Sequence, residues 1–467
     1  MSALTLTIEN QHLISSDLAN HYKVIPSEVT EKGLSFFVDE AYNNDDHKEE
    51  LSLLLGKSVQ LIPVDSKDVE KALSLYYRKE RITASSKSFQ IDQQDFLERL
   101  ISEAKSLKSS DIHFEIYEKD ARIRFRIDGQ LIERYKVEHE NYLELVNKIK
   151  IKSKLNITEK RLPQDGRITT DNFDIRVSIL PTLFGEKIVM RLLGNDASHI
   201  ELSTLGLEEE ELRYYLEAVK KPNGILLISG PTGSGKTTTL YATLKLLNDS
   251  VRNIVTVEDP IEYTLKGINQ VQLKEDIGLT FASALRSFLR QDPDIIMLGE
   301  IRDSETAMMA IRASLTGHLV LSTIHTNSAV GTISRLIDMG IPSYLIAETL
   351  NISVAQRLIR KLCPHCKEPT DFVSEDFPES YTIPYPIATL FKPKGCNSCY
   401  HTGYSGRRAI YEILRIDSKV VSCIKNNEMD GFLGKNGSHQ TLSDKAYYIL
   451  SQGETSLEEI YSILITS

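Results

Sequence analysis

The segment best suited to chemistry is Gly230-Pro231-Thr232-Gly233-Ser234-Gly235-Lys236-Thr237, which matches the phosphate-loop pattern GxxxxGK[ST] in full. It lies between the apolar run ILLIS and the helix-forming run TTTLYATLKLLN. Glycines there let backbone amides turn toward a phosphate, and a helix N-terminus adds the positive end of its dipole. We expect this loop and Thr238 to bind a nucleotide, with Lys236 on the outer phosphates and Thr237 on Mg²⁺. A chance match in a glycine-rich turn is the alternative.

Two later apolar runs end in carboxylates. Residues 254–257 run into EDPIE, which ends at Glu262, and residues 294–298 run into GEIRD, which contains Glu300. In an open parallel sheet, chemistry lies at the carboxyl ends of the strands, so both clusters should lie near the phosphate loop. One carboxylate is needed to hold Mg²⁺, and another to orient or deprotonate the attacking water. Asp303, just before SETAMMAIRASL, fits the simpler role of a helix N-cap.

A histidine follows the next apolar run, residues 319–324, at the same edge of the predicted sheet. This is His325, in the string HTN. A lone histidine is more often structural, but its place at a strand end favours a contact with a γ-phosphate. His318, at the other end of the run, stays open between the two roles.

Four arginines could supply charge to such a site. Arg286 and Arg290 are four residues apart and share one helix face, beside an apolar stripe. Arg176 and Arg191 lie on predicted strands further upstream. Arginine offers phosphate a planar fork of donors, and an arginine finger can be worth about 10³–10⁵ in rate. Ion-paired surface arginines are the commoner case, and spacing alone does not select among the four.

Four of the five cysteines form two CxxC pairs, Cys363 with Cys366 and Cys396 with Cys399. Four thiolates at this spacing make a closed, tetrahedral and therefore structural zinc site. A redox dithiol is the alternative, but two pairs favour zinc. In zinc-finger peptides such a site contributes about 10–16 kcal/mol of folding free energy. Cys423 is isolated and fits an apolar core position.

The composition is that of a soluble, globular chain of several domains, with 467 residues, 41% hydrophobic residues and a net charge of −10. The acidity argues against a protein that coats nucleic acid. No apolar run reaches the roughly 18 residues of a membrane helix, and the N-terminus has no secretory signal pattern. We therefore expect a cytosolic protein whose membrane contact is indirect, through partners.

Three textures follow one another along the chain. Residues 1–80 alternate short apolar runs (34–38 and 59–64) with helical periodicity (47–56 and 66–78), and the polar stretch 82–87 reads as a linker. Residues 92–206 contain predicted strands at 121–127, 173–180 and 187–193. From residue 207, apolar runs at 224–229, 254–257, 294–298 and 319–324 alternate with helical segments, as in a parallel sheet with crossover helices.

The strand predicted at residues 121–127, ARIRFRI, alternates strictly. Ile123, Phe125 and Ile127 should therefore share one face, with three arginines on the other. The dipeptide DG follows at once and predicts a hairpin turn.

In combination these motifs resemble the secretion ATPase superfamily. The matching strings are GPTGSGKTTTLYA, TVEDPIEY, RQDPDIIMLGEIRD and TGHLVLSTIHTN. The further strings SSDIHFE, RFRIDG, RLPQDGRI, CPHCK and GCNSCYHTGYSGRRAIYEIL make the chain similar to the type II secretion and type IV pilus assembly branch, the GspE/PilB family. The resemblance is dense over residues 92–420 and loose before them.

The resemblance implies an α/β fold with a RecA-like P-loop core and a parallel sheet. A small N-terminal α/β domain and a PAS-like module precede the core, and a zinc-binding insertion and a helical C-terminus complete it. We expect an N-terminal docking domain at 1–81, the PAS-like module at 92–206, the ATPase core at 207–360, the tetracysteine segment at 361–408 and the C-terminal helical region at 409–467.

The resemblance also implies roles for individual residues. Residues 230–237 would be the Walker A loop, 257–263 the Asp box with Glu262 as catalytic glutamate, 294–300 the Walker B motif with Glu300 near Mg²⁺, and 317–326 the His box. Arg176, Arg191, Arg286 and Arg290 fall where the family places nucleotide-contacting arginines.

The implied activity is ATP hydrolysis by a homo-hexamer that drives pseudopilus assembly and protein export. Residues 1–81 would dock on the cytoplasmic domain of an inner-membrane protein, beside a polytopic platform protein. A pilus-assembly or DNA-uptake motor of the same family is the alternative, and the short N-terminal region favours secretion. Two further rivals are a nucleic-acid translocase or zinc-ribbon protein, disfavoured by the acidity, and a regulator without hydrolysis, disfavoured by the intact Lys236, Glu262 and Glu300.

Overall fold

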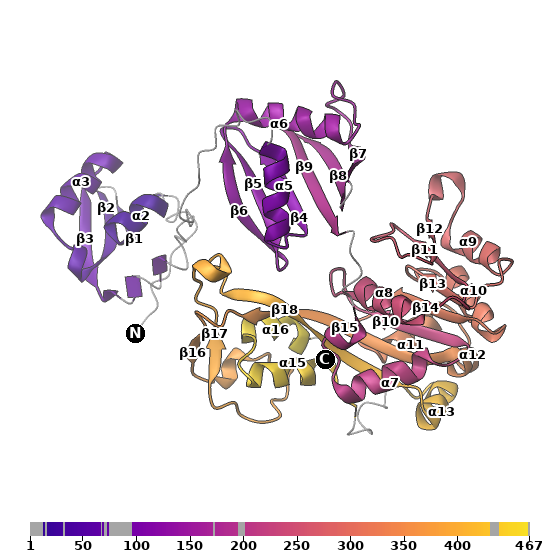
Figure 1. Cartoon of the computed structure of the whole chain (residues 1–467). Coiled ribbons are helices and arrows are strands. Elements are labelled where there is room, and N and C mark those ends of the chain that lie inside the picture. Colours follow the sequence, from indigo (N-terminus) through magenta and orange to yellow (C-terminus); the bar gives the residue numbers. More distant parts are fainter. Residues whose placement is uncertain are drawn as a thin grey trace. The chain divides into compact units, whose positions relative to one another are not determined.

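The computed structural model describes residues 13–14, 16–30, 33–66, 68–69, 72–73, 96–170, 173–194, 201–429 and 439–465. The chain divides into two compact units, residues 1–89 and 90–467 (Figure 1). The predicted linker at 82–87 lies outside the described residues, as does most of the helix predicted at 66–78.

The first unit is a small α/β fold. Its sheet has the order β1-β2-β3, with β1 and β2 antiparallel and β2 and β3 parallel. The elements are α2 (Ser16–Tyr22), β1 (Val24–Thr30), β2 (Gly33–Asp39), α3 (Asp45–Leu55) and β3 (Val59–Val64). Helix α3 begins where Asn44 accepts a hydrogen bond from the amide of His47 and ends at Gly56, whose φ is +65°. The strands predicted at 34–38 and 59–64 are confirmed, and β1 is an additional strand that contains Pro26.

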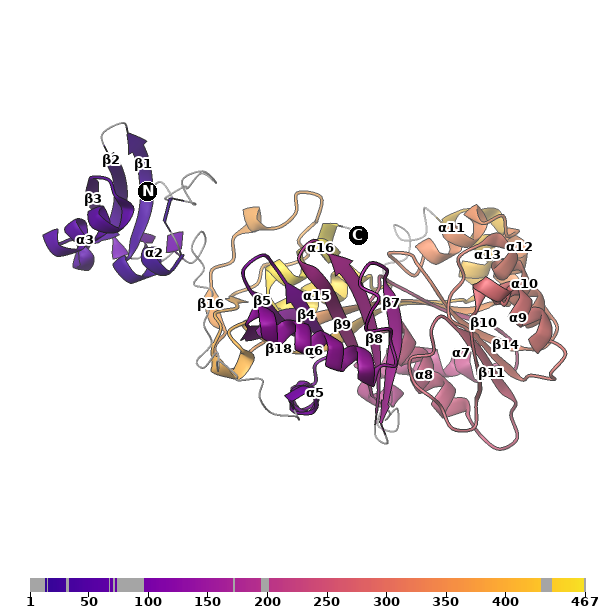
Figure 2. The same ribbon diagram turned by 90° about the horizontal axis from the view of Figure 1, so that it is seen from above.

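The second unit begins with a six-stranded antiparallel sheet of order β6-β5-β4-β9-β8-β7. Helices α5 and α6 lie against one face of it (Figure 2). The elements are α5 (Phe96–Ser106), β4 (Asp111–Ile116), β5 (Ala121–Ile127), β6 (Gln130–Val137), α6 (His139–Lys152), β7 (Gln164–Thr170), β8 (Phe173–Thr182) and β9 (Gly185–Gly194).

The alternation predicted for β5 is confirmed. Ile123, Phe125 and Ile127 are buried, while the arginines between them lie half-buried on the opposite face. That second face is a polar ladder, in which Glu115 of β4 pairs with two of these arginines. Asp128 and Gly129 form the predicted two-residue turn, with φ of +48° and +85°, between the paired residues of β5 and β6.

The rest of the second unit is built around a seven-stranded sheet of order β12-β11-β13-β14-β10-β15-β18. The described pairs from β12 to β15 are parallel, and β18 joins β15 antiparallel. The strands are β10 (Gly224–Ser229), β11 (Ile254–Glu258), β12 (Asn269–Gln272), β13 (Ile295–Leu298), β14 (Leu319–Ile324), β15 (Leu350–Leu362) and β18 (Tyr404–Arg415).

Helices cover both faces of this sheet, which explains its continuous apolar strands. One face packs against α7 (Glu209–Val219) and α8 (Lys236–Leu247). The other packs against α9 (Phe281–Phe288), α10 (Ser304–Leu315), α11 (Gly331–Asp338) and α12 (Ser343–Thr349). All residues of β10, β11, β13 and β14 are buried, so these strands form the central layer of the core.

The tetracysteine segment is inserted between β15 and β18. It contains the short antiparallel strands β16 (Glu368–Thr370) and β17 (Leu390–Lys392). The C-terminal region is helical, with α13 (Ser418–Asn426), α15 (Leu442–Ser451) and α16 (Leu457–Ile465). Strand β18 extends to Arg415, so the helices start later than residue 409. The predicted RecA-like α/β core with a cysteine-bearing insertion and a helical C-terminus is confirmed.

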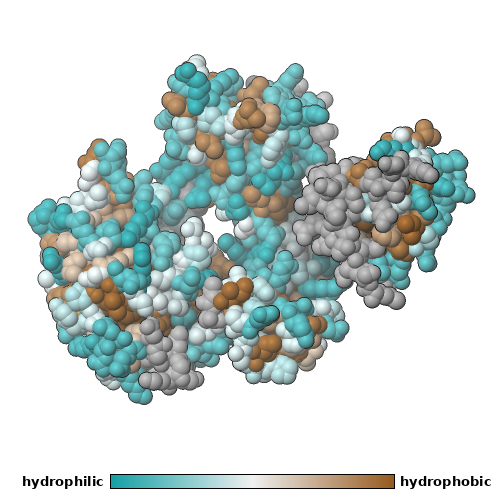
Figure 3. All heavy atoms as spheres, turned by 180° about the vertical axis from the view of Figure 1, so that it is seen from behind, coloured by the Kyte–Doolittle hydropathy of each residue, from teal (hydrophilic) through white to brown (hydrophobic). Residues whose placement is uncertain are grey.

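Among the described residues, no helix combines the length and apolar character needed to span a bilayer. On the face drawn in Figure 3, hydrophobic residues form separate patches among polar ones.

Candidate nucleotide-binding site and tetracysteine cluster

The phosphate loop connects β10 to α8, as predicted. Gly230, Gly233 and Gly235 have φ of +145°, +81° and +90°, and residues that carry a side chain rarely adopt such backbone angles. A Cβ at Gly230 would lie 2.5 Å from the carbonyl oxygen of Gln356, and one at Gly235 would lie 2.8 Å from its Nε2. The backbone conformation therefore requires glycine at both positions, and at Gly230 the close approach of the β15 backbone requires it as well.

Lys236 is the first residue of α8 and points back into the loop. Its Nζ donates hydrogen bonds to the carbonyl oxygens of Gly230 (2.7 Å) and Pro231 (3.1 Å). Burial lowers the pKa of Lys236, and the attraction of Glu300 opposes that effect. Thr237 and Thr238 are half-buried in the same helical turn. The loop thus concentrates a buried cation and a helix N-terminus at one point, which suits an anionic ligand.

Glu300 follows β13 and lies beside His325, which follows β14. The His325 Nε2 atom is 3.1 Å from Oε2 of Glu300, and Arg302 forms an ion pair with Oε1. The hydrogen bond to Glu300 raises the pKa of Arg302. The structure therefore brings two predicted site residues together and adds Arg302, which the sequence analysis did not select. Its position in the same GEIRD string was the available signal.

Glu262 follows β11 and lies near Arg176 of β8. The Arg176 Nη1 atom is 3.8 Å from Oε2 of Glu262, and its Nη2 donates to the carbonyl of Ile261. The hydroxyl of Tyr241, on α8, accepts a hydrogen bond from the amide of Glu262 (3.2 Å) and donates one to Glu258. Helix α8 therefore helps to position the acidic segment after β11.

Three predicted arginines lie elsewhere. Arg191 pairs with Asp111 within the antiparallel sheet (3.0 Å). Arg286 forms an exposed ion pair with Glu305. Helix α9 ends at Phe288, so Arg290 lies in the turn after it and does not share a helix face with Arg286, although it donates to the carbonyl of Arg286 (2.9 Å). Of the four arginines, the contacts of the described residues bring only Arg176 to a predicted site carboxylate.

Asp303 and His318, for which the sequence also allowed a structural role, make structural contacts. The side chain of Asp303 accepts a hydrogen bond from the amide of Thr306 (2.8 Å), so Asp303 is the N-cap of α10, as predicted. The Nδ1 atom of His318 lies 2.8 Å from the carbonyl oxygen of Ala313 at the end of the same helix, which is a structural contact.

Sequence reasoning missed two residues of β15 that contact the loop region. Gln356 is buried, and its Oε1 accepts a hydrogen bond from Oγ1 of Thr239 (2.9 Å). Arg357 donates to the carbonyl of Asn327, two residues after His325 (3.0 Å). No sequence pattern links them to the loop, because their proximity depends on the parallel pairing of β15 with β10.

The four predicted cysteine ligands form one cluster. Their Sγ atoms lie within 4.8 Å of one another, and Cys363–Cys396, Cys366–Cys399 and Cys396–Cys399 are separated by 3.9, 3.7 and 3.8 Å. Zinc–sulfur bonds of about 2.3 Å in a tetrahedron place sulfur atoms about 3.8 Å apart. Burial raises the pKa of Cys366 to about 12, so this thiol needs a nearby cation to ionise at neutral pH. The cluster therefore fits zinc.

The fold and the phosphate loop place this chain in the class of RecA-like P-loop proteins. Comparisons with known proteins identify its family within that class. The profile of the family described as Type II/IV secretion system protein matches residues 88–462. The type II secretion system protein E of Pseudomonas aeruginosa is 46% identical over 370 residues, which are 78% of this chain and 74% of that protein. The type IV pilus assembly ATPase PilB of Myxococcus xanthus is 42% identical over 434 residues, or 84% of this chain and 77% of that one.

Among solved structures, the pilus retraction motor PilT with bound ADP superposes with a TM-score of 0.55 at 27% identity, and the match covers 78% of this chain and 96% of that one. The chain belongs to the Type II/IV secretion system protein family, the secretion ATPases.

Proposed function

We propose that this chain hydrolyses ATP in the presence of Mg²⁺ and that hydrolysis drives pseudopilus assembly and protein export through a type II secretion system. The observation that carries the proposal is the meeting of three groups at the carboxyl ends of neighbouring strands. Lys236 follows β10, Glu300 follows β13 and His325 follows β14, and Glu300 attracts Lys236 electrostatically and pairs with His325. This is the edge at which parallel sheets bind nucleotides.

The chain's own residues then divide the work. The loop amides and Lys236 hold the phosphates. Thr237 and Glu300 supply oxygen ligands of the kind that Mg²⁺ prefers. When bound there, Mg²⁺ would neutralise charge on the phosphates. Glu262 orients or deprotonates the attacking water. His325, which contacts Glu300, also contacts the γ-phosphate.

We infer that the working form is a homo-hexamer, because three of the four arginines are not used at the site of their own chain. Arg286 is exposed on α9, Arg290 is exposed in the turn after it, and Arg191 is exposed on β9. They can therefore reach the nucleotide of a neighbouring subunit, while Arg176 serves its own Glu262.

The proposed division into domains follows the same scheme: 1–81 for docking, 92–206 as the PAS-like module, 207–360 as the ATPase core, 361–408 as the zinc segment and 409–467 as the C-terminal region, whose helices begin after β18. Residues 1–81 would bind the cytoplasmic domain of an inner-membrane protein, next to a polytopic platform protein. The motor would thus act in the cytoplasm, peripheral to the inner membrane through its partners.

A second candidate is a motor for type IV pilus assembly or DNA uptake. The similarity to the pilus assembly ATPase of M. xanthus, which covers 84% of this chain, favours it. Deletion of the gene separates the two candidates, because loss of protein export without loss of pili supports secretion.

Steady-state ATPase activity measured against protein concentration tests the proposal, with mass determined by light scattering in the same samples. We expect activity to rise steeply as hexamers form, because each site would need arginines from a neighbour. Activity independent of assembly would return the arginine roles to a single chain, and no ATPase activity at any concentration would refute the proposed function.

Replacing Glu300 with glutamine should leave ATP binding intact and lower turnover about 100-fold, since the amide keeps the shape of the carboxylate without its charge. Single-turnover phosphate release and chromatography of the bound nucleotide measure the two effects. Glu217→Gln is the matched control, because Glu217 is exposed on the outer side of α7. A normal product burst from Glu300→Gln would contradict the assignment.

Replacing Arg176 with alanine should lower turnover about 10-fold, because a charged hydrogen bond to the segment of Glu262 is lost. The melting temperature should change little, since Arg176 is half-buried and the buried residues Ile175 and Val177 lie on the opposite face of its strand. Arg167→Ala is the control in the same module, because Arg167 pairs with Asp174 on the neighbouring strand. Kinetics like those of the wild type would make Arg176 an ordinary surface arginine.

A further inference from the structure

Arg357 is a half-buried cation at the side of the phosphate loop. Its guanidinium donates to the carbonyl oxygens of Gln356 (3.1 Å) and Asn327 (3.0 Å). Among the described residues, no carboxylate forms an ion pair with it. Burial lowers the pKa of Arg357, against the attraction of Glu412. A guanidinium in such surroundings is costly unless an anion compensates it.

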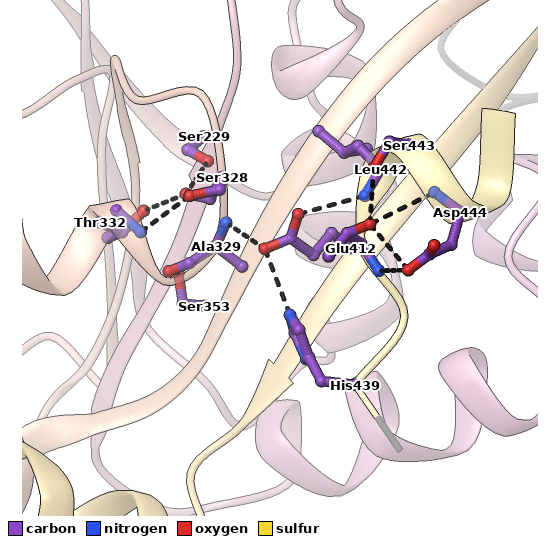
Figure 4. Close-up of polar contacts among 12 residues, drawn as sticks. Ser229, Ser328, Ala329, Thr332, Ser353, Glu412, His439, Leu442, Ser443 and Asp444 are labelled. Atoms are coloured by element: carbon purple, nitrogen blue, oxygen red, sulfur yellow. Dashed lines mark hydrogen bonds and ion pairs between the residues drawn. The ribbon is translucent and has the colours of Figure 1, made fainter. Parts of the chain in front are cut away.

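Glu412, the carboxylate that attracts Arg357, forms its hydrogen bonds with other residues. Glu412, in β18, is buried and accepts hydrogen bonds from the amides of Ala329 (2.8 Å) and Leu442 (3.3 Å). Its Oε1 also lies 3.4 Å from Nε2 of His439 (Figure 4). These contacts hold Glu412 between the turn after β14 and the start of α15, so it does not act as the counter-ion of Arg357.

Arg360, the next arginine on the same strand, differs from Arg357 in having a carboxylate partner. Arg360, three residues further along β15, pairs with Glu459, with Nε 2.7 Å from Oε2. The same strand thus carries one arginine with a carboxylate partner and one without, and the one without lies beside the phosphate loop.

A second polar group faces the same place. The hydroxyl of Ser234 is buried, and within the described part of the chain it has no hydrogen-bond partner. The point at which a Gly230 side chain would begin lies 2.7 Å from this hydroxyl and 3.2 Å from Nη1 of Arg357. The ammonium of Lys236 is bonded to the carbonyl of that same Gly230. Two cations and an unpartnered hydroxyl therefore surround one residue of the loop.

We propose that Arg357 is a further substrate-contacting residue, which binds the outer phosphates of the nucleotide from β15 of the same chain. The inference rests on the proposed ATP-binding function and deepens it. Lys236 identifies the end of the nucleotide, because the lysine of this loop type reaches the β- and γ-phosphates. The planar fork of Arg357 suits two oxygens of one phosphate, and it would exchange its two carbonyl acceptors for them.

Nucleotide binding to the full-length chain tests the assignment, with AMP-PNP and ADP titrated against the wild type, Arg357→Gln and Arg357→Lys. We expect Arg357→Gln to weaken AMP-PNP binding about 10-fold or more and ADP binding clearly less, because a charged hydrogen bond to the outer phosphates is lost. Arg357→Lys should restore part of the AMP-PNP affinity. Arg415→Gln, on the surface of β18, is the control and should bind both nucleotides like the wild type.

Two results would overturn the assignment. AMP-PNP binding by Arg357→Gln at wild-type affinity would remove the phosphate contact. Equal losses for AMP-PNP and ADP, with a lower melting temperature, would mean that Arg357 only fixes the turn at Asn327. Failure of the proposed function looks different, because the wild type itself would then bind neither nucleotide.

Discussion

Replacing Lys236 with alanine should reduce ATP turnover at least about 100-fold, the largest loss expected from any single site substitution in this chain. The ammonium is buried at the start of α8, and two backbone carbonyls of the loop already orient it. A preorganised donor aimed at developing phosphate charge is typically worth about 10²–10³ in rate. Alanine is a good helix former, so the helix itself should persist. Coupled-assay turnover at saturating ATP measures the effect.

Lys245→Ala is the matched control for this substitution, because Lys245 lies on the exposed side of the same helix. Both variants should unfold at the wild-type temperature. If Lys236→Ala retains wild-type turnover, the assignment of the phosphate loop is wrong. If both variants lose activity and stability together, the helix and not the ammonium is responsible.

Removal of zinc should produce the largest loss of stability. The segment between β15 and β18 has two three-residue strands and packs Phe377, Ile387 and Leu390 into the core, and the four cysteines join its two ends. Structural zinc contributes about 10–16 kcal/mol in zinc-finger peptides. We expect Cys363→Ser to lose bound zinc and to lower the melting temperature sharply. ATP turnover should fall as well, because β15 also carries Gln356 beside the phosphate loop.

Elemental analysis of the purified chain and thermal unfolding measure these effects. Cys423→Ser is the control, since Cys423 lies outside the cluster on α13 and should retain zinc and stability. A wild-type chain that carries no zinc after expression in zinc-supplemented medium would contradict the zinc assignment. The redox alternative for the two pairs would then regain weight.

The parts of the site that are continuous in the sequence were predictable. The loop, the strand before it and the helix after it occupy one stretch of chain, and the glycine positions follow from local backbone conformation. The alternation of β5 and the DG turn are local in the same sense. The CxxC pairs predicted a cluster because four thiols at that spacing have few other uses, and the structure brings the four together.

Local patterns were less informative where pairing or packing decides. Strand β1 was not predicted because Pro26 and the polar residues of VIPSEVT give no clear alternation, and its pairing with β2 defines it as a strand. The arginines could not be ranked either. Arg191 forms an ion pair with Asp111, and Arg286 forms one with Glu305. Arg176 lies beside Glu262 because of the way in which the two sheets of the second unit pack.

The sequence by itself therefore determined the class of chemistry, a phosphate loop followed by acidic strand ends, and the donor set of the metal cluster. Only the tertiary structure decided which side chains meet there: His325 with Glu300, Tyr241 with the amide of Glu262, and Arg357 beside Gly230. The physical reason is that a sequence motif consists of residues close together in the chain, whereas these contacts join elements that are far apart in it. Their proximity follows from sheet order and register, which burial and backbone pairing fix together.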